Sequence, residues 1–280
     1  MDYEKVFNKI IEETYEYLNK NNLKTMILGI SGGIDSTITA AICYEITKRY
    51  SKDNLKFIGV NLPCSSNTED ENNSALNTMK AFCKKDNYWI QNLEKEYELM
   101  KSTCELHSTS TIISQGNIKA RLRMIYLYNL ASTLNGIVID TDNLTEYYLG
   151  FFTIHGDMGD YNPIGGLWKH EIYDLAKYLL KYYLNDLDKI NAIKKCIEII
   201  PTDGNGIDDG GDMAQIAPGY TYNDVDNILI SYIKNDDKGI EECKMKYGFD
   251  TVNRVIQRMK NSEFKRKRLP IVIHRSLYEN

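Results

Sequence analysis

The chain has 280 residues, a formal net charge of −5 and a hydrophobic content of 42%. This is enough for a sizeable core, and we expect one domain spanning residues 1–280. The negative net charge argues against a nucleic-acid-binding surface spread over the whole molecule, because such surfaces are basic. No segment approaches membrane-spanning length, and the N-terminus lacks the basic start and apolar core of a signal peptide, so we expect a cytoplasmic protein with no membrane partner.

The six cysteines contain no CxxC pair, and the four histidines are dispersed along the chain. Neither a zinc site nor a disulfide framework is therefore predicted. We expect the cysteines to be reduced thiols in or near the core.

Hydrophobic periodicity predicts a chain in which helices alternate with strands. The expected elements are helix 3–22, strand 25–30, a helix from residue 34, strand 56–62, helix 68–84, helix 117–134, strand 137–140, and closing helices 223–232 and 239–260. This order is typical of βαβ units and predicts an α/β fold, a doubly wound parallel sheet with helices on both faces. Ligands of such sheets bind beyond the carboxyl ends of the strands. The Gly- and Asp-rich stretch 204–211 is either a plain linker or a lid.

Residues 28–43, LGISGGIDSTITAAIC, lead from the first strand directly into a helix. Gly32 and Gly33 fall where the first helical N–H groups have no partner and the helix dipole is positive, which predicts an anion site. Hydroxyl groups at Ser31, Ser36 and Thr37 can add donors. The stretch is neither a Walker A loop, since it has no lysine, nor a GxGxxG dinucleotide loop.

Asp35 lies beside this loop and would repel a phosphate unless a divalent cation joined the two, so the loop also predicts Mg²⁺. Glu146 follows the strand at 137–140 and could share that ion. The alternative for both residues is an ordinary carboxylate near a helix N-terminus.

Residues 29–37, GISGGIDST, resemble the pyrophosphate loop of the N-type ATP pyrophosphatases, and the rest of the chain resembles ammonia-dependent NAD synthetase. The further matching segments, in the order of that family, are GNIKARLRM (116–124), DTDNLTEYYLG (140–150), GFFTIHGDMGDYNP (150–163), GLWKHEIYDLA (166–176) and PTDG (201–204). The resemblance implies an adenine nucleotide alpha-hydrolase-like fold.

It also implies an AMP-forming ligase that makes a C–N bond. ATP activates the carboxylate of deamido-NAD as an acyl-adenylate, ammonia displaces AMP, and the products are NAD, AMP and pyrophosphate. ATP is the co-substrate, Mg²⁺ the cofactor, and a homodimer the expected assembly. Two alternatives stay open: the same chemistry on another carboxylate, such as nicotinate mononucleotide, and a non-catalytic nucleotide-binding homologue.

The resemblance assigns roles to individual residues. Asp35 and Lys169 are assigned to catalysis, and Asp35 and Glu146 to the metal. The expected ATP-binding residues are Gly29, Ile30, Ser31, Gly32, Gly33, Ile34, Asp35, Ser36, Thr141, Lys169 and Thr202. For the deamido-dinucleotide, the family's substrate arginine corresponds to Arg121, and Asp160 and Lys265 are further polar candidates.

The chain departs from the family at positions expected to contact the substrate. Ile154 replaces a usual lysine, and Phe264 replaces the histidine of an HKR sequence. Asn61 replaces a common arginine and Asp140 a usual glycine. The ATP and Mg²⁺ motifs are intact, so these departures bear on substrate identity more than on the chemistry. The helix at 117–134 is apolar on more than one face, which favours burial against a second subunit.

Overall fold

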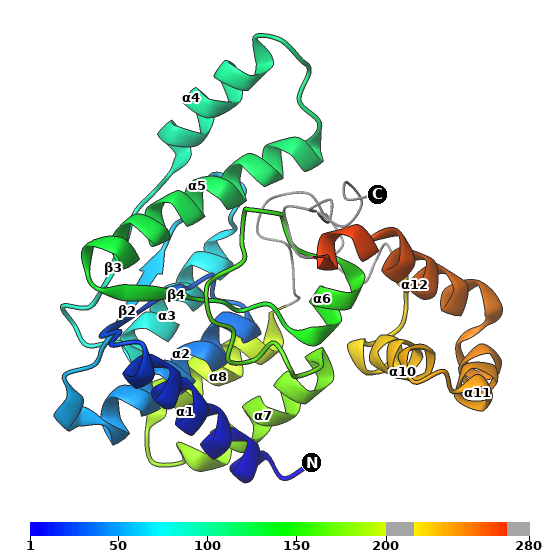
Figure 1. The fold of residues 1–280 in the computed structure, drawn as a ribbon, viewed down its shortest axis with the longest axis horizontal. Coiled ribbons are helices and arrows are strands. Elements are labelled where there is room, and N and C mark those ends of the chain that lie inside the picture. Colours follow the sequence, from blue (N-terminus) through cyan, green and yellow to red (C-terminus); the bar gives the residue numbers. More distant parts are fainter. Residues whose placement is uncertain (200–215, 268–280) are drawn as a thin grey trace, which may run out of the picture.

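A four-stranded parallel sheet with the strand order β3-β2-β1-β4 lies at the centre of the computed structural model, which describes residues 1–199 and 216–267 (Figure 1). The strands are β1 (Thr25–Gly29), β2 (Lys56–Asn61), β3 (Tyr88–Ile90) and β4 (Gly136–Ile139). Thr25 of β1 is in register with Lys56 of β2 and with Gly136 of β4. The predicted parallel sheet is confirmed. The sequence did not indicate β3, which has three residues and is only partly buried.

Helices cover both faces of the sheet. They are α1 (Tyr3–Lys20), α2 (Ile34–Arg49), α3 (Glu69–Phe82), α4 (Glu94–Glu105), α5 (Ile112–Thr133), α6 (Leu144–Leu149), α7 (Lys169–Tyr182) and α8 (Leu187–Glu198). A short 3₁₀ turn, η1 (Ser51–Asp53), follows α2. Successive strand residues point to opposite faces. Accordingly, Met26 and Leu28 pack with α1, α2, α3, α7 and α8, whereas Ile27 packs with α4 and α5.

Helix α5 begins five residues earlier than the apolar periodicity indicated, at Ile112. Its N-cap is Thr111, whose hydroxyl accepts a hydrogen bond from the backbone N of Ser114, while the Ser114 hydroxyl accepts a 2.8 Å hydrogen bond from the backbone N of Thr111. This reciprocal capping satisfies two amides that the first turn leaves unpaired. The first turn therefore belongs to the helix, although its two isoleucines, Ile112 and Ile113, are exposed and do not continue the buried face.

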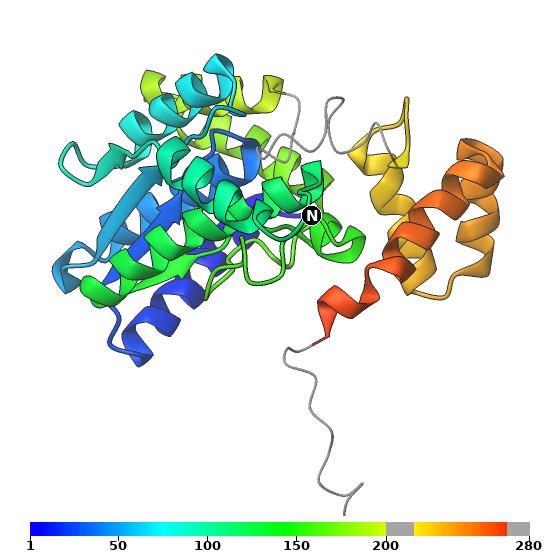
Figure 2. The ribbon, with the colours of Figure 1, turned by 90° about the horizontal axis from the view of Figure 1, so that it is seen from above.

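Besides the cores on the two faces of the sheet, a further hydrophobic core lies among the last helices, α10 (Tyr222–Ile233), α11 (Asp237–Tyr247) and α12 (Phe249–Asn261). The 3₁₀ turn η2 (Glu263–Arg266) follows them. Figure 2 shows these helices to one side of the sheet and its covering helices. The single helix predicted over 239–260 is wrong, because Gly248, with φ +83°, separates α11 from α12. Residues 204–211 lie outside the described part of the chain, and the single domain over 1–280 stays a prediction.

All six cysteines are free, and Cys104 is exposed, unlike the buried or partly buried position expected. Within residues 1–199 and 216–267, no helix combines the length and apolar character needed to cross a bilayer.

Gly32 is the residue at which the loop before α2 most depends on the absence of a side chain. Its φ is +89°, and a Cβ there would lie 2.5 Å from the backbone N of Ala75 and 2.6 Å from the carbonyl oxygen of Glu71. Because those are backbone atoms of α3, they cannot move aside cheaply. A 2.7 Å hydrogen bond from the Ser74 hydroxyl to Gly32 O also keeps the loop close to α3.

We expect Gly32→Ala to lower the free energy of unfolding by about 1–3 kcal/mol, the usual cost of a strained backbone conformation. Urea denaturation measures this loss. Gly166→Ala is the matched control, because nothing lies within 4 Å of a Cβ at that position. Equal stability of the two variants would contradict the proposed constraint on Gly32.

Candidate active site

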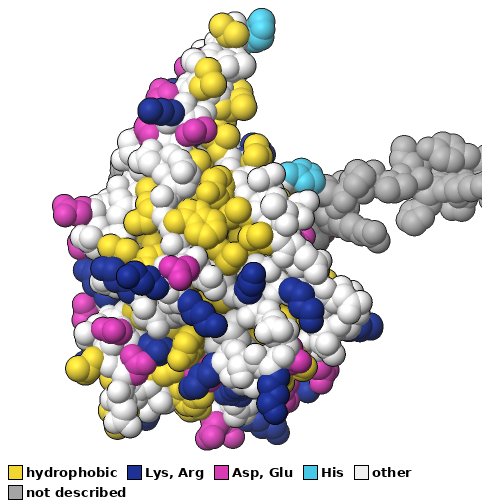
Figure 3. Space-filling view, turned by 90° about the vertical axis from the view of Figure 1, so that its left-hand side faces the viewer, with side chains coloured by type: hydrophobic (Ala, Val, Ile, Leu, Met, Phe, Trp, Pro, Cys, Tyr) yellow, Lys and Arg dark blue, Asp and Glu magenta, His cyan; other side chains and the backbone are white. Residues whose placement is uncertain are grey.

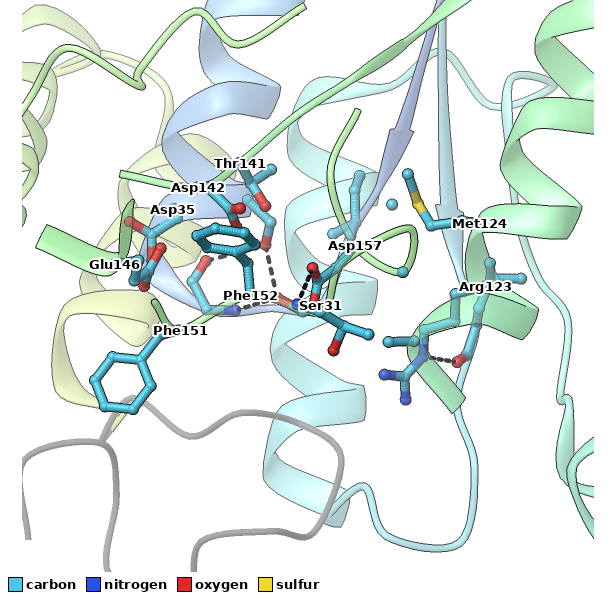
Figure 4. A pocket seen from close by; sticks show the side chains of 18 of the residues that line it. Ser31, Asp35, Arg123, Met124, Thr141, Asp142, Glu146, Phe151, Phe152 and Asp157 are labelled. Atoms are coloured by element: carbon cyan, nitrogen blue, oxygen red, sulfur yellow. Dashed lines mark hydrogen bonds between the residues drawn. The ribbon is translucent and has the colours of Figure 1, made fainter. Parts of the chain in front are cut away.

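A pocket of about 420 Å³ opens where β1, β2 and β4 end at the carboxyl edge of the sheet (Figure 4). Most of the residues predicted to bind ATP line it: Gly29, Ile30, Ser31, Gly33, Ile34, Asp35, Ser36, Thr141 and Lys169. The first seven belong to β1, the following loop and α2, and Thr141 follows β4. Two distant parts of the chain therefore meet at one site because their strands are neighbours in the sheet.

The loop from Ser31 to Gly33 presents the beginning of α2 to the pocket. Gly33 is the N-cap of α2 and has no side chain with which to cap it. The Ser31 hydroxyl lies 3.1 Å from the Ser36 hydroxyl and accepts a 3.3 Å hydrogen bond from Gly33 N. Unpaired amides and two hydroxyls at a helix N-terminus form an anion-binding arrangement. Thr37 does not contribute, because it is buried and bonds to Thr78.

Lys169, the first residue of α7, carries a buried ammonium group that joins two carboxylates from other elements. Its Nζ lies 2.5 Å from Asp35 Oδ2 on α2 and 2.9 Å from Glu146 Oε1 on α6. The exposed fractions of these side chains are 2% for Lys169, 16% for Asp35 and 14% for Glu146. Burial alone would disfavour the charged amine, but the attraction of both carboxylates outweighs it and raises the pKa of Lys169 well above its ordinary value.

Asn143 orients both carboxylates. Its Nδ2 donates a 2.9 Å hydrogen bond to Asp35 Oδ1, and its backbone N donates a 3.1 Å hydrogen bond to Glu146 Oε2. The Asn143 side chain also caps α6 by accepting from Glu146 N. Glu146 thus belongs to a capping box, as the structural alternative expected, and at the same time turns its other oxygen toward Lys169. Sequence reasoning did not single out Asn143, although an Asn three residues before a Glu is a capping signal.

Further acidic side chains line the pocket beside this ion pair. Burial raises the pKa of Asp157 to about 6, and burial together with the nearby charges of Asp140 and Asp157 raises the pKa of Asp142 well above its usual range. Asp140 does not line the pocket. Its carboxylate accepts hydrogen bonds from Asp142 N and Gly159 N and so holds the segment after β4 close to Gly159.

Three basic side chains also line the pocket, namely Arg123, Arg258 and Lys265. Arg123 donates to Leu62 O at 3.0 Å and to Asn67 Oδ1 at 3.1 Å. Lys265 donates to the carbonyl oxygens of Gly150 and Phe152 and lies 5.2 Å from the centre of the Phe152 ring. Burial lowers the pKa of Lys265, and the charge of Arg258 lowers it further.

Several predicted site residues are not brought to the pocket. Arg121 is exposed and its guanidinium donates to Ile154 O, whereas Arg123, two residues further along α5, lines the pocket. Asp160 is also outside the lining, and its carboxylate accepts from Val138 N. Gly32 packs against α3 as described above, and Thr202 lies outside the described residues.

The two positions at which the sequence departs from the expected substrate contacts lie outside the pocket lining as well. Ile154 belongs to a turn, and the Phe264 side chain is 55% exposed on η2. Asn61, by contrast, is buried in the lining, and its Nδ2 donates a 2.8 Å hydrogen bond to Ile30 O. It therefore links β2 to the beginning of the loop Ser31–Gly33, called the SGG loop below.

Asp35 and Glu146 are the carboxylates whose oxygens converge on one point, and hard oxygen donors of this kind suit a divalent cation such as Mg²⁺. No group of three or more His, Cys, Asp or Glu side chains arranged to hold a metal occurs in the part of the chain that the structure describes. One or two protein carboxylates are nonetheless a common complement for Mg²⁺ when phosphate oxygens and water complete its shell.

Comparisons with known proteins show the family of the chain. The family model of NAD synthase matches residues 6–269. The NH₃-dependent NAD⁺ synthetase of Campylobacter jejuni is 31% identical over 239 residues, which cover 85% of this chain and 87% of that protein. The solved structure of NH₃-dependent NAD synthetase from C. jejuni in complex with the nitrate ion has a TM-score of 0.74 and 27% identity, and the match covers 98% of this chain and all of that one.

The structure of NMN synthetase from Francisella tularensis is also similar, with a TM-score of 0.76 at 23% identity over 98% of this chain and 100% of that chain. At this identity the likeness shows a shared fold. The parallel sheet with helices on both faces is thus a known α/β nucleotide-binding fold.

We expect Lys169→Met to destabilise the protein by about 3–5 kcal/mol at pH 8, because two buried carboxylates lose their shared cation. The repulsion between the two uncompensated carboxylates costs stability only while both are charged, so this cost falls as the pH is lowered toward the ordinary carboxyl range near 4. The loss relative to the unaltered protein is therefore smaller at pH 5 than at pH 8. Urea denaturation at both pH values measures it.

Lys189→Met is the control for this prediction. Lys189 is also a buried lysine, but its partner Asp186 is 41% exposed, so removing the amine leaves no buried carboxylate behind. A pH-independent loss in Lys169→Met, or a loss no larger than that of the control, would contradict the role of Lys169 as the shared counter-ion.

Proposed function

Because this chain belongs to the NAD synthase family, we propose that it catalyses the ATP-dependent amidation of deamido-NAD with ammonia, forming NAD, AMP and pyrophosphate. It is a ligase that makes a C–N bond, with ATP as the co-substrate. The observation that carries the proposal is the convergence of Lys169, Asp35 and Glu146 beside the open N-terminus of α2, in one pocket at the carboxyl edge of the sheet.

The chemistry follows from the poor reactivity of a carboxylate toward ammonia. Attack of the substrate carboxylate on the α-phosphorus of ATP expels pyrophosphate and gives an acyl-adenylate. Ammonia then attacks the acyl carbon, AMP leaves with its bonding electrons, and the nitrogen loses a proton to give the amide. The ammonium of Lys169 and the amides of Gly33 and its neighbours stabilise the charge on the departing pyrophosphate. No covalent intermediate with the protein is needed, so a nucleophilic side chain is not required.

We assign Asp35 and Glu146 as the residues that hold Mg²⁺. Both carboxylates line the pocket on either side of Lys169 Nζ, and both are held in place by Asn143. Mg²⁺ held by these carboxylates beside Lys169 would neutralise phosphate charge next to them. The same argument speaks against a non-catalytic nucleotide-binding homologue, since binding alone would not require this set of charges.

Deamido-NAD is the preferred substrate in this proposal, and nicotinate mononucleotide is the alternative carboxylate. The alternative rests on Ile154 and Phe264, and neither side chain lines the pocket. The replacements therefore do not remove a donor from the described wall. Among the basic residues that do line it, Arg123, Arg258 and Lys265 are candidates for contacts with substrate phosphates.

A homodimer is the proposed assembly. Met124 and Leu127 of α5 are buried against the sheet, whereas Ile125 is 65% exposed, so α5 has a second apolar face. The exposed hydrophobic side chains of α4 and α5 include Leu99, Met100, Ile112, Ile113, Ile125 and Tyr128. Figure 3 shows hydrophobic atoms in a run that extends from the end of the molecule formed by α4 toward its middle. Continuous apolar surface of this kind is typical of a subunit interface. A cytoplasmic location and the absence of nucleic-acid and membrane partners stay predictions.

The catalytic proposal is tested by incubating the protein with ATP, Mg²⁺, ammonia and either deamido-NAD or nicotinate mononucleotide, with chromatography of the amide and AMP. We expect NAD and AMP in equal amounts from deamido-NAD. Asp35→Asn and Glu146→Gln should each lower the turnover by at least about 100-fold. Even a residue that only supports a metal ligand lowers metal affinity or activity by about 10–100-fold when it is replaced. Glu13→Gln, on the surface of α1, is the control. Amidation of nicotinate mononucleotide alone, or full activity of Asp35→Asn, would overturn the assignment.

The assembly is tested by Ile125→Asp, which places a charge on the exposed apolar face of α5. We expect sedimentation velocity to show a dimer for the unaltered protein at micromolar concentration and mainly monomer for the variant, because a buried unpaired charge is costly. Leu187→Asp is the matched control, since Leu187 is 73% exposed on α8 and lies in none of these helices. A monomeric unaltered protein would contradict the proposal.

A further inference from the structure

Asp226 of α10 is a fully buried carboxylate whose hydrogen-bond partners lie on α6 and α7, two of the helices that carry site residues. Its Oδ1 accepts a 2.5 Å hydrogen bond from the hydroxyl of Thr145 on α6. Its Oδ2 accepts a 3.0 Å hydrogen bond from the backbone N of His170 on α7 and lies 2.7 Å from His170 Nδ1. Asp226 therefore joins α10 to α6 and to the first turn of α7.

The same network continues to Lys169. The hydroxyl of Thr145, which donates to Asp226, accepts a 2.9 Å hydrogen bond from the backbone N of Lys169. The first amides of a helix have no partner within the helix. In α7 two of them are satisfied by this network, those of Lys169 and His170, so the position of the first turn is fixed from α6 and α10.

A second contact from α10 reaches the side chain of Lys169. The ring centre of Tyr222, four residues before Asp226 and hence on the same face of α10, lies 5.3 Å from Lys169 Nζ. An aromatic face at this distance attracts an ammonium group. Helix α10 thus acts on Lys169 in two ways: Asp226 reaches its backbone N through the Thr145 hydroxyl, and Tyr222 contacts its amine.

From these contacts we propose that α10 is a positioning element for the reaction: Asp226, acting through Thr145 and the backbone of α7, sets where the ammonium of Lys169 lies between Asp35 and Glu146. The inference rests on the proposed function, in which Lys169 stabilises the departing pyrophosphate. Asp226 is a positioning residue, because its carboxylate contacts neither the pocket lining nor the Lys169 amine.

The burial of the Asp226 carboxylate favours a role in positioning α7 over a role in helix packing alone. A fully buried carboxylate must be compensated for its lost hydration, and an apolar side chain would often join the helices at lower cost. What the carboxylate provides is direction, because its two oxygens select separate donors on α6 and α7. An error of about 1 Å in the place of a catalytic group can lower a rate 100-fold, so such direction has a catalytic consequence.

The test compares Asp226→Asn with Asp224→Asn. Asn in place of Asp226 removes the negative charge, and its NH₂ group either opposes the backbone N–H of His170 or reverses the hydrogen bond with the Thr145 hydroxyl, so the contacts to α6 and α7 are weakened. Asp224 lies on the same helix, where its carboxylate caps the first turn through Thr221. The control therefore weakens α10 without touching α7. Thr145→Val is a second variant, which removes the hydroxyl between Asp226 and Lys169 N.

Two measurements are made on the full-length chain: steady-state amidation of deamido-NAD and hydrogen exchange of the amides at the beginning of α7. For Asp226→Asn and Thr145→Val we expect a kcat about 10–100-fold lower with the KM for ATP within about twofold. The amides of Lys169 and His170 should exchange about tenfold faster or more, because their hydrogen bonds to the Thr145 hydroxyl and to the Asp226 carboxylate are lost or weakened in these variants. Asp224→Asn should lose melting temperature while keeping both its kcat and the protection of these amides.

Equal losses of kcat in Asp226→Asn and Asp224→Asn at equal losses of melting temperature would contradict the proposal, since Asp226 would then serve only the packing of α10. Unchanged exchange at Lys169 and His170 in Asp226→Asn would contradict it whatever the activity. An unaltered protein that forms no NAD would instead contradict the proposed function, and the exchange data would still decide whether Asp226 fixes the first turn of α7.

Discussion

The buried ammonium of Lys169 is the interaction on which the arrangement of the site depends. Its 2% exposed side chain requires compensation by negative charge, and that charge comes from α2 through Asp35 and from α6 through Glu146. Helices α2, α6 and α7 must therefore meet at the carboxyl edge of the sheet for any of the three groups to be buried at acceptable cost. A requirement that links three helices also fixes the walls of the pocket between them.

The parts of this site that could be predicted are those that follow from position in a parallel sheet. The SGG loop and Thr141 each follow a strand, β1 and β4, and those strands are neighbours. Periodicity located both strands, and the carboxyl ends of neighbouring parallel strands necessarily share one edge. Lys169 was predicted only from the family resemblance, because it begins a helix and does not follow a strand.

The parts that could not be predicted depend on side-chain direction and on distant packing. Arg121 and Arg123 both lie on α5, but two residues along a helix turn a side chain to nearly the opposite face, and only Arg123 reaches the pocket. Asp226 lies 57 residues beyond Lys169, in a helix whose place against α7 no local pattern encodes. The break between α11 and α12 at Gly248 was also missed, because residues 239–260 were predicted as one helix.

The ionic contacts of the pocket walls bear on how the site selects a ligand. Lys169 is held by two carboxylates, and Lys265 by the carbonyl oxygens of Gly150 and Phe152. A phosphate that approaches either amine therefore competes with existing partners, whereas the amides at the beginning of α2 have no side-chain cap to displace. In the proposed reaction we therefore expect a polyphosphate to contact the SGG loop first, and Lys169 to contact an anion only after its carboxylates are offset by other positive charge.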